Sequence, residues 1–397
     1  MASSDLTVER ISDALLGKHI DVIVSGSIGA VESTRFVRSL RRLGARVTPW
    51  LTEGAKQFTT NTALSWASAE KVVESFSGDA SHIGLADACV IAPASANIIA
   101  KIARGITDTP ASALVASYLG QGKPVMFIPN MHESLSHSPF VKSNTEKIEA
   151  YCTKLQPRME EGKLKFPEPA VLADQIAHSL NSVAGMFPAM VAMGTTRGYI
   201  DDVRYISNYS SGALGSKIAE ELYRQGLTTY VVAGPSPIRP KAYSKLIEVD
   251  TNDSLERTSL QLVEEEKAAV VFASSVLDFI PDQKQDGKIK SSEDLQVSFV
   301  KTDKIIAKLK PEHGIKVGFK LEADLDEAKA KAIATDYMEK YSLSLMVLNS
   351  LKEVTATAHK AYIVSRNDKG DLQWTQKDGK QQIAAMIAKH IKLASLN

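Results

Sequence analysis

The chain has 397 residues, of which 44% are hydrophobic and 23% are charged, and its formal net charge is +1. This length and composition predict a globular protein of two or three domains, and the balanced charge gives no support for binding to nucleic acid or to an anionic membrane. No run of 18 apolar residues occurs, so a membrane-spanning helix is not expected.

The expected compartment is the cytoplasm. The N-terminal stretch MASSDLTVERISD carries acidic residues where a secretory signal would need basic and then apolar residues. The sequence contains two cysteines, Cys89 and Cys152, which excludes a disulfide framework and favours a reducing compartment.

Strand and helix patterns alternate along the first half of the chain. An apolar strand is expected over residues 21–25, followed by a loop from Gly26 to Gly29 and an amphipathic helix over residues 30–43. Further apolar strands are expected over residues 46–51, 88–92 and 125–129. This alternation predicts a parallel, doubly wound sheet.

The second half repeats this layout after a polar segment over residues 153–169 and a helix over residues 171–183. We therefore expect two α/β domains, one of residues 1–183 and one of residues 184–397. The segment 281–294, PDQKQDGKIKSSED, is too charged for a core and predicts an exposed, mobile flap. The strands of the second domain are expected over residues 190–193, 229–233, 269–273, 316–319 and 345–348.

One loop, GTTRGYIDDVRYISNYSSGALG over residues 194–215, joins a strand to a helix in the second half. Backbone N–H groups at a helix N-terminus bind phosphate, and long loops inside α/β domains are usually functional. The loop is also rich in polar side chains that suit a triphosphate and an acid. Its string Ile-Asp-x-Val-Arg-x-Ile-Ser-Asn-x-Ser-Ser-Gly-x-x-Gly resembles the signature loop of phosphopantothenate–cysteine ligases.

This resemblance implies roles for individual residues. Asn208 is expected to contact an acyl-cytidylate, and the strand end over residues 272–278 is expected to bind the base of CTP through Asp278. Lysines of the flap are expected to close over the triphosphate, which binds together with Mg²⁺. The implied catalytic residues are Asn208 and Lys288, and the implied substrate-binding residues are Arg204, Phe272, Ala273, Ser274, Asp278, Lys290 and Phe319.

The second half departs from the ligase pattern at a later helix. Tyr337 and Tyr341 stand where the family often has lysines, so phosphate contacts are expected to be redistributed, with Lys340 as the candidate substitute.

The first half resembles the homo-oligomeric flavin-containing cysteine decarboxylases. The resemblance lies in VSGSIGA from Val24, in Thr52, and in IAPASAN from Ile91 followed by KIARGI. It implies an FMN site and a catalytic histidine, His82, in SHIGLAD. The implied FMN-binding residues are Gly26, Ser27, Ile28, Thr52, Ser95 and Asn97.

The first half also departs from the decarboxylase pattern. Pro129-Asn-Met-His132 replaces the usual Pro-x-Met-Asn, so His132 is expected to hold the substrate carboxylate. The family's Ala-Cys-Gly flap does not occur, and Cys152, in Ala-Tyr-Cys-Thr, is expected to be a helix residue and not the proton donor. The segment PRMEEGK resembles the archaeal-type branch, in which Arg158 or Lys163 would close the site.

Together the two resemblances imply a flavodoxin-like, Rossmann-type FMN domain followed by a second Rossmann-like nucleotide-binding α/β domain. The implied activity is bifunctional. CTP-dependent condensation of 4'-phosphopantothenate with cysteine would be followed by FMN-dependent decarboxylation to 4'-phosphopantetheine. Trimeric FMN domains and dimeric ligase domains are expected. Two alternatives stay open: an active ligase with a flavin-binding scaffold that no longer decarboxylates, and a regulatory flavoprotein.

Overall fold

The computed structural model describes residues 4–78, 80–160, 163–290, 294–323, 326–350, 352, 359–367 and 369–396. The chain divides into two compact units, Met1–Leu180 and Asn181–Asn397. The division falls in the last turn of α7 (Pro169–Asn181), whereas the sequence placed it between residues 183 and 184. Within the described residues, no helix is both long enough and apolar enough to cross a membrane.

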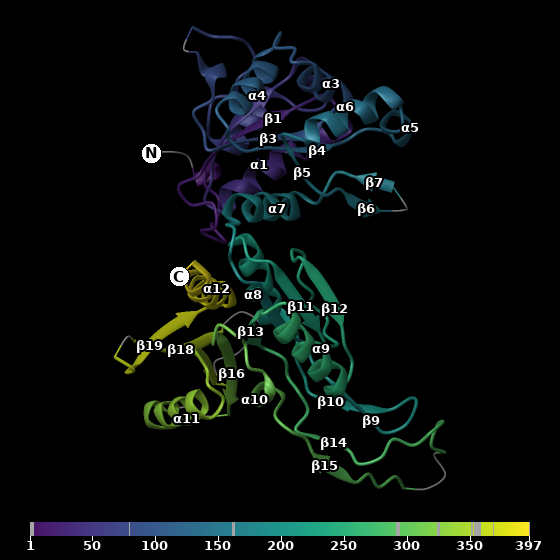
Figure 1. Ribbon diagram of the computed structural model, residues 1–397, viewed down its shortest axis with the longest axis vertical. Coiled ribbons are helices and arrows are strands. Elements are labelled where there is room, and N and C mark those ends of the chain that lie inside the picture. Colours follow the sequence, from purple (N-terminus) through teal and green to yellow (C-terminus); the bar gives the residue numbers. More distant parts are fainter. Residues whose placement is uncertain are drawn as a thin grey trace. The chain divides into compact units, whose positions relative to one another are not determined.

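The first unit is built on one parallel sheet, in the order β2-β1-β3-β4-β5 (Figure 1). This is the strand order of flavodoxin-like folds, and it confirms the expected parallel, doubly wound sheet. The strands are β1 (His19–Val24), β2 (Arg46–Leu51), β3 (Ala88–Ala94), β4 (Val125–Pro129) and β5 (Thr153–Lys154).

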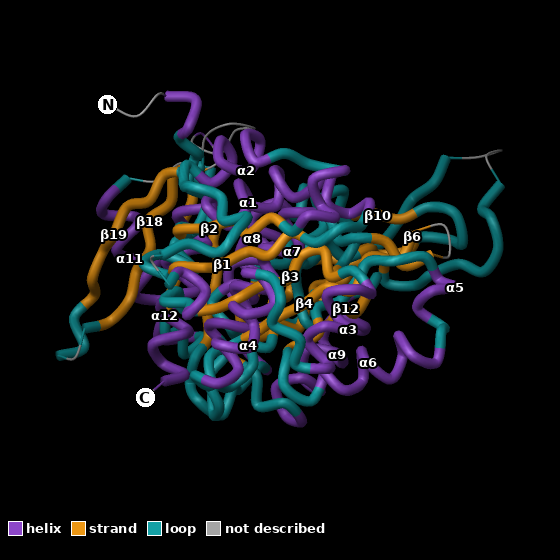
Figure 2. Tube along the Cα trace, turned by 90° about the horizontal axis from the view of Figure 1, so that it is seen from above, coloured by secondary structure: helices purple, strands orange, loops and turns teal. Residues whose placement is uncertain are grey.

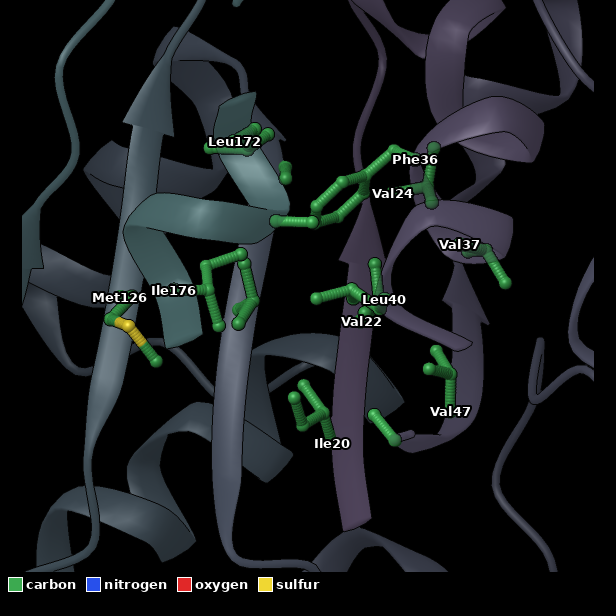
Figure 3. Packing of buried hydrophobic residues seen from close by; sticks show 14 of the residues in the cluster. Ile20, Val22, Val24, Phe36, Val37, Leu40, Val47, Met126, Leu172 and Ile176 are labelled. Atoms are coloured by element: carbon green, nitrogen blue, oxygen red, sulfur yellow. The ribbon is translucent and has the colours of Figure 1, made fainter. Parts of the chain in front are cut away.

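Helices cover both faces of this sheet. Side chains of β1 alternate between the faces: Val22 and Val24 pack with the helices α1 (Ser33–Arg42) and α7 (Figure 3). Ile23 packs with the helices of the other face. The other helices of the unit are α2 (Asn61–Ser68), α3 (Ala96–Arg104), α4 (Pro110–Gly120), α5 (Glu133–Ser136) and α6 (Pro139–Glu149), with short 3₁₀ turns η1 (Ser4–Leu6), η2 (Ile28–Glu32), η3 (Glu53–Gln57) and η4 (Ser81–Ile83).

The polar segment over residues 153–169 belongs to the first unit and lies within the expected domain of residues 1–183. It supplies β5 and a small hairpin, β6 (Arg158–Glu160) with β7 (Lys163–Lys165), and the buried Leu155 and Phe166 join the core. The expectation that Cys152 is a helix residue is wrong, since α6 ends at Glu149 and Cys152 lies in the turn before β5. Burial of these two apolar side chains stabilises the packing of the polar segment on the core.

The second unit contains an eight-stranded sheet in the order β12-β11-β8-β13-β16-β17-β18-β19. The first six strands are parallel, in Rossmann-like order, and the last two are antiparallel and lie side by side at one edge (Figure 2). The five expected strands are present, as β8 (Ala189–Met193), β11 (Thr229–Ala233), β13 (Ala269–Phe272), β16 (Lys316–Glu322) and β17 (Leu345–Ser350). The sequence did not indicate β12 (Lys245–Glu248), β18 (Lys360–Arg366) or β19 (Leu372–Asp378).

Two hairpins extend from the second unit as an arm (Figure 1). One pairs β9 (Arg197–Tyr199) with β10 (Tyr205–Ser207), and the other pairs β14 (Phe279–Pro281) with β15 (Phe299–Lys301). The expected signature loop is therefore partly strand. The helices of this unit are α8 (Ala213–Arg224), α9 (Asn252–Glu265), α10 (Ile305–Lys308), α11 (Glu327–Lys340) and α12 (Lys380–Leu396).

Replacing Ile176 of α7 by alanine should lower the free energy of unfolding of the first unit by about 2–4 kcal/mol, because the fully buried side chain would leave a cavity above the sheet. Urea unfolding followed by the fluorescence of Trp50 and Trp66 measures this loss. Ile106→Ala is the matched control, since Ile106 is 45% exposed, and should change the free energy by less than about 0.5 kcal/mol. Equal losses would show that α7 is not part of the core.

Candidate functional sites

Three loops meet at the carboxyl edge of the sheet in the first unit. They follow β1, β3 and β4, whose carboxyl ends share one edge because the strands are parallel. Together with the β6–β7 hairpin they enclose a cavity of about 580 Å³. Its lining includes the expected site residues Gly26, Ser27, Ile28, Ser95, His132 and Arg158, along with Gly29, Val31, Glu32, Ala96, Asn130, Met131, Leu135, Lys165 and Phe166.

Glycine is required in the first of these loops by close backbone approach. A Cβ on Gly26 would lie 2.8 Å from the carbonyl carbon of Gly54, in the loop after β2. A Cβ on Gly29 would lie 2.7 Å from Oδ1 of Asn130. Both distances are shorter than van der Waals contact, so any larger residue would push the loop away from its neighbours.

Asn130 joins the loops after β1 and β4, and the sequence analysis missed it. Its Oδ1 accepts hydrogen bonds from Oγ of Ser27 at 2.7 Å and from the backbone N–H of Gly29 at 3.0 Å. The side chain is 9% exposed and lines the cavity. The one available signal was its place directly after a strand, in the Pro-Asn-Met-His string that was quoted for His132. Its two hydrogen bonds hold the glycine loop against the β4 loop.

A second polar contact ties β1 to β3. Oγ of the buried Ser25 donates to the carbonyl of Pro93 at 2.7 Å and accepts from the backbone N–H of Ser95 at 2.8 Å. Ser95 is the residue before α3, so this contact fixes the N-terminus of that helix at the cavity. Backbone N–H groups at such a terminus suit an anion.

Basic, imidazole and apolar side chains complete the lining of the cavity. Nδ1 of His132 lies 3.2 Å from the backbone N–H of Ser134 and accepts from it, which leaves Nε2 as the atom that carries the proton of the neutral ring. Arg158 forms an ion pair of 2.8 Å with Glu160. The side chain of Lys163 lies outside the described residues. Ile28 is 68% exposed at the rim. The cavity therefore combines anion donors with apolar surface, as a planar aromatic phosphate ester requires.

Three expected residues of this half lie outside the cavity lining. Thr52 donates both its backbone N–H and its hydroxyl to the carbonyl of Val24, and these bonds join the loop after β2 to the end of β1. Asn97 points to solvent on the first turn of α3. His82 lies in η4, next to the C-terminal half of α4.

His82 and the cavity lie at opposite edges of the sheet. The carbonyl of Ile83 accepts hydrogen bonds from Ser117 and Gln121 at the end of α4, just before β4 begins. This is the amino-terminal edge of the sheet, whereas the cavity is at the carboxyl edge. Nδ1 of His82 is buried with no hydrogen-bond partner among the described residues, and the ring packs edge-on against Phe76 at 5.6 Å.

Neither cysteine has the environment of a reactive thiol. Burial raises the pKa of Cys152 to about 11, and burial, followed by the nearby Asp21 carboxylate, raises the pKa of Cys89 well above its usual value. A thiol of raised pKa is a poor nucleophile at neutral pH.

In the second unit, the signature loop leaves β8 through a glycine that is conformationally required. Gly194 has φ +79°, and a Cβ there would lie 2.4 Å from the carbonyl oxygen of Gly234. Gly212, at the N-cap of α8, also has a positive φ, +74°. These two glycines bring the loop across the carboxyl edge of the sheet and turn it into the helix, with the α8 N-terminus open to an anion.

Asn208 connects the signature loop to the expected base-binding segment. Its Nδ2 donates to the carbonyl of Val276 at 2.9 Å and lies 3.5 Å from the carbonyl of Ser275. In the same segment Oγ of Ser274 donates to the carbonyl of Gly194 at 3.1 Å. Phe272 is buried, and Phe319 on the neighbouring β16 is partly buried against the core. Asn208, Phe272 and Ser274 therefore lie at one edge of the sheet, whereas Arg204, Lys288 and Lys290 lie on the arm.

Asp278 is exposed and paired. Its Oδ1 lies 2.5 Å from Nζ of Lys304, so a nucleobase that donates to this carboxylate would meet a charge already balanced by lysine.

The structure does not bring Lys340 to the expected nucleotide site within one chain. Lys340 is the last residue of α11, which runs antiparallel to β16 and β17, so it lies at the amino-terminal edge of the sheet, away from the glycine loop. Its Nζ instead lies 5.6 Å from the ring centroid of Tyr341. The sequence shows that Lys340 is close to Tyr337 and Tyr341 along the chain, but not which end of their helix faces the site.

The flap is exposed, as expected, but its described part is hydrogen-bonded to the signature loop. Lys288 and Lys290 flank Ile289, whose N–H donates to the carboxylate of Asp201 at 3.1 Å. Burial alone would raise the pKa of Asp201, but backbone N–H groups of Arg204, Val203 and Ile289 and the Arg204 guanidinium lower it to about 2. Flap residues 291–293 lie outside the described residues.

A further cavity of about 660 Å³ lies beside the signature hairpin, at the ends of β11 and β12, and the sequence analysis did not indicate it. Its charged side chains are mutually paired: Nη1 of Arg197 lies 3.1 Å from Asp250, and Nη2 of Arg239 lies 3.6 Å from Glu248. Within the described residues, no group of three or more His, Cys, Asp or Glu side chains is arranged to hold a metal ion.

Comparisons with known proteins agree with the division into two units. A family model described as Flavoprotein matches residues 9–181, and one described as DNA/pantothenate metabolism flavoprotein C-terminal domain matches residues 187–394.

Whole-chain relatives share one description, coenzyme A biosynthesis bifunctional protein CoaBC. The protein from Thermococcus kodakarensis is 34% identical over 369 residues, which are 90% of this chain and 91% of the relative. The protein from Methanocaldococcus jannaschii is 29% identical over 96% of each chain. The protein from Escherichia coli K12 is 29% identical over 80% of this chain and 83% of the relative.

Gly26→Ala should lower the free energy of unfolding of the first unit by about 1–3 kcal/mol, because its Cβ would meet backbone atoms of Gly54 that cannot rotate away. Gly54→Ala is the reciprocal control: its Cβ would meet Cα of Gly26 at 3.5 Å, an ordinary contact, and should change the free energy by less than about 0.5 kcal/mol. Thermal unfolding of both variants measures these two changes in stability. A Gly26→Ala protein as stable as the parent would mean that the two loops are not in contact.

Proposed function

The chain belongs to the family of bifunctional coenzyme A biosynthesis proteins, and on this basis we propose that it catalyses two consecutive steps. The second unit condenses 4'-phosphopantothenate with cysteine, and the first unit decarboxylates the product to 4'-phosphopantetheine. One observation carries the proposal. Each unit has its own set of glycine loops and polar side chains at the carboxyl edge of its own parallel sheet.

The cavity of the first unit fits FMN. The close-packed glycines hold the loop after β1 at the cavity wall, the N-terminus of α3 lines the same cavity, and exposed apolar side chains such as Ile28 suit the flavin ring. Gly26, Ser27, Ile28 and Ser95 would hold the cofactor, with Asn130 as an added member. Bound FMN supplies a reversible two-electron oxidation of the cysteinyl CH₂–SH group, without which loss of CO₂ has no electron acceptor.

The chain's own residues hold the substrate and move its protons. His132 would donate from Nε2 to the substrate carboxylate, because Nδ1 is already occupied by the Ser134 N–H. His82 would take the thiol proton as a general base. Its place at the opposite edge of the sheet supports a site completed by a second copy of the chain, in keeping with trimeric FMN domains.

The ligase chemistry requires an activated carboxylate. We propose that CTP, with Mg²⁺, activates phosphopantothenate as an acyl-cytidylate, which cysteine then attacks through its amine. Asn208 would donate to the acyl group, Lys288 and Lys290 would neutralise the triphosphate, and the N-terminus of α8 would receive phosphate oxygens. Cytosine would replace Lys304 as the partner of Asp278, or share that carboxylate with it.

Dimeric ligase domains are supported by the surface of the arm. Its hairpins expose apolar side chains that a monomer would leave in water: Val203 is 60% exposed, Phe279 56% and Phe299 46%. The two alternatives, a scaffold without decarboxylase activity and a regulatory flavoprotein, are not favoured, because the whole-chain relatives are bifunctional enzymes.

Asn208→Ala should abolish ligation, or slow it by about 10²–10³, because one donor to a developing oxyanion is lost. Decarboxylation of supplied phosphopantothenoylcysteine should be unchanged, since the two units have separate sites. Purified protein is given phosphopantothenate, cysteine, CTP and Mg²⁺, and pyrophosphate and CO₂ are followed separately. The parent enzyme should release both, with CTP preferred over ATP. If neither product forms, the proposed function is wrong, and equal loss of both activities in the variant would mean that the units are coupled.

The two histidines should differ in kinetics. His82→Asn should stop CO₂ release, because the thiol loses its base. His132→Ala should raise KM about 10- to 100-fold with little change in kcat, since a hydrogen bond to a charged group is worth about 1.5–3 kcal/mol. An unchanged KM in His132→Ala would contradict the role given to this residue.

A further inference from the structure

Asp201 is completely buried, although it lies in the turn of an exposed hairpin. Its carboxylate accepts four hydrogen bonds: from the backbone N–H of Val203 at 2.8 Å, of Arg204 at 2.6 Å and of Ile289 at 3.1 Å, and from Nη1 of Arg204 at 2.6 Å. Two of these donors shape the turn itself. The donor from Ile289 belongs to the flap, 88 positions away in the sequence, so the Asp201 carboxylate joins the turn of the hairpin to the flap.

Ile289 is held at both of its backbone polar atoms. Its N–H donates to Asp201, and its carbonyl accepts from Nη1 and Nη2 of Arg204, at 3.3 Å each. Arg204 is itself paired with Asp201, so one carboxylate and one guanidinium grip a single residue of the flap. The guanidinium fork supplies this geometry, which a lysine at position 204 could not reproduce.

The residues on either side of Ile289 are Lys288 and Lys290. Asp202, the next residue of the turn, holds the flap residues that precede Lys288. Its carboxylate accepts from the Gly287 N–H at 2.9 Å and pairs with Lys284 at 2.6 Å. Both partners of the Asp202 pair are about half exposed, so solvent screens it, whereas the Asp201 contact is shielded. A flap fixed in advance does not lose backbone freedom when it closes on a ligand.

We propose that Asp201 is a positioning residue of the ligase site, which acts through Ile289 to place Lys288 and Lys290 for the nucleotide triphosphate. The inference rests on the proposed function of those lysines. It also gives Arg204 a role in the flap in place of direct contact with substrate.

The test is a double-mutant cycle on the full-length protein, with CTP affinity measured by calorimetry in the presence of Mg²⁺. Asp201→Asn is close in shape but weakens the pair with Arg204, and it should raise the Kd for CTP about 10-fold. In a background that carries both Lys288→Ala and Lys290→Ala, the same substitution should change the Kd less than 2-fold, because its effect passes through these two lysines. An undiminished effect of Asp201→Asn in that background would overturn the proposal.

Trypsin supplies a readout that does not depend on activity. In the absence of nucleotide, Asp201→Asn should increase cleavage after Lys288 and Lys290 about 10-fold, because the flap backbone is released. Glu221→Gln is the matched control: Glu221 is a buried carboxylate of the same unit, bonded to Arg224 and Gln381, and its loss should leave flap cleavage and CTP affinity unchanged. Unchanged cleavage in Asp201→Asn would overturn the proposal.

Arg204→Lys is the second variant, for use if Asp201→Asn fails to fold. It keeps the charge beside Asp201 but loses the fork to the Ile289 carbonyl, so it should also raise flap cleavage and the Kd for CTP. Failure of the proposed function has a different signature: Lys288→Ala would then leave CTP affinity and ligation unchanged, while the trypsin result would still decide whether Asp201 holds the flap.

Discussion

Parallel strand pairing is the constraint on which both sites depend. Since neighbouring parallel strands run the same way, the loops that follow them must meet at one edge of the sheet, however far apart they are in the sequence. In the first unit this brings the residues after β1, β3 and β4 to one cavity. In the second unit it brings the loop after β8 to the end of β13, where Asn208 donates to the Val276 carbonyl.

The loops can meet because glycine lets backbones touch. Gly26 packs on Gly54, and Gly194 packs on Gly234, at distances that leave no room for a Cβ. Small polar side chains also join the loops to each other through hydrogen bonds. These side chains are Ser25 and Asn130 in the first unit and Ser274 and Asn208 in the second. Each unit thus presents backbone donors in a fixed arrangement, which is what phosphate recognition needs.

The two units differ in how they complete a site. The first has a concave cavity with an apolar rim, but its histidine candidate, His82, lies at the other edge of the sheet. The second has a flap that its own signature loop grips through Asp201 and Arg204. Exposed apolar side chains lie near both sites, among them Ile28 and Val31 in the first unit and Val203 and Phe279 in the second.

The sequence by itself determined most strands of the two parallel sheets, because each of these is a short apolar run, and it identified the loops that follow them from their unusual strings. It did not indicate the parallel edge strands β5 and β12, which are short and largely polar. It could not indicate the antiparallel edge strands, whose half-exposed patterns are locally ambiguous, or the place of Asn130, Asp201 and Lys340. Those depend on which loop faces which and on the direction in which a helix returns. Such contacts join residues up to 103 positions apart, and only the folded chain brings them within hydrogen-bond distance.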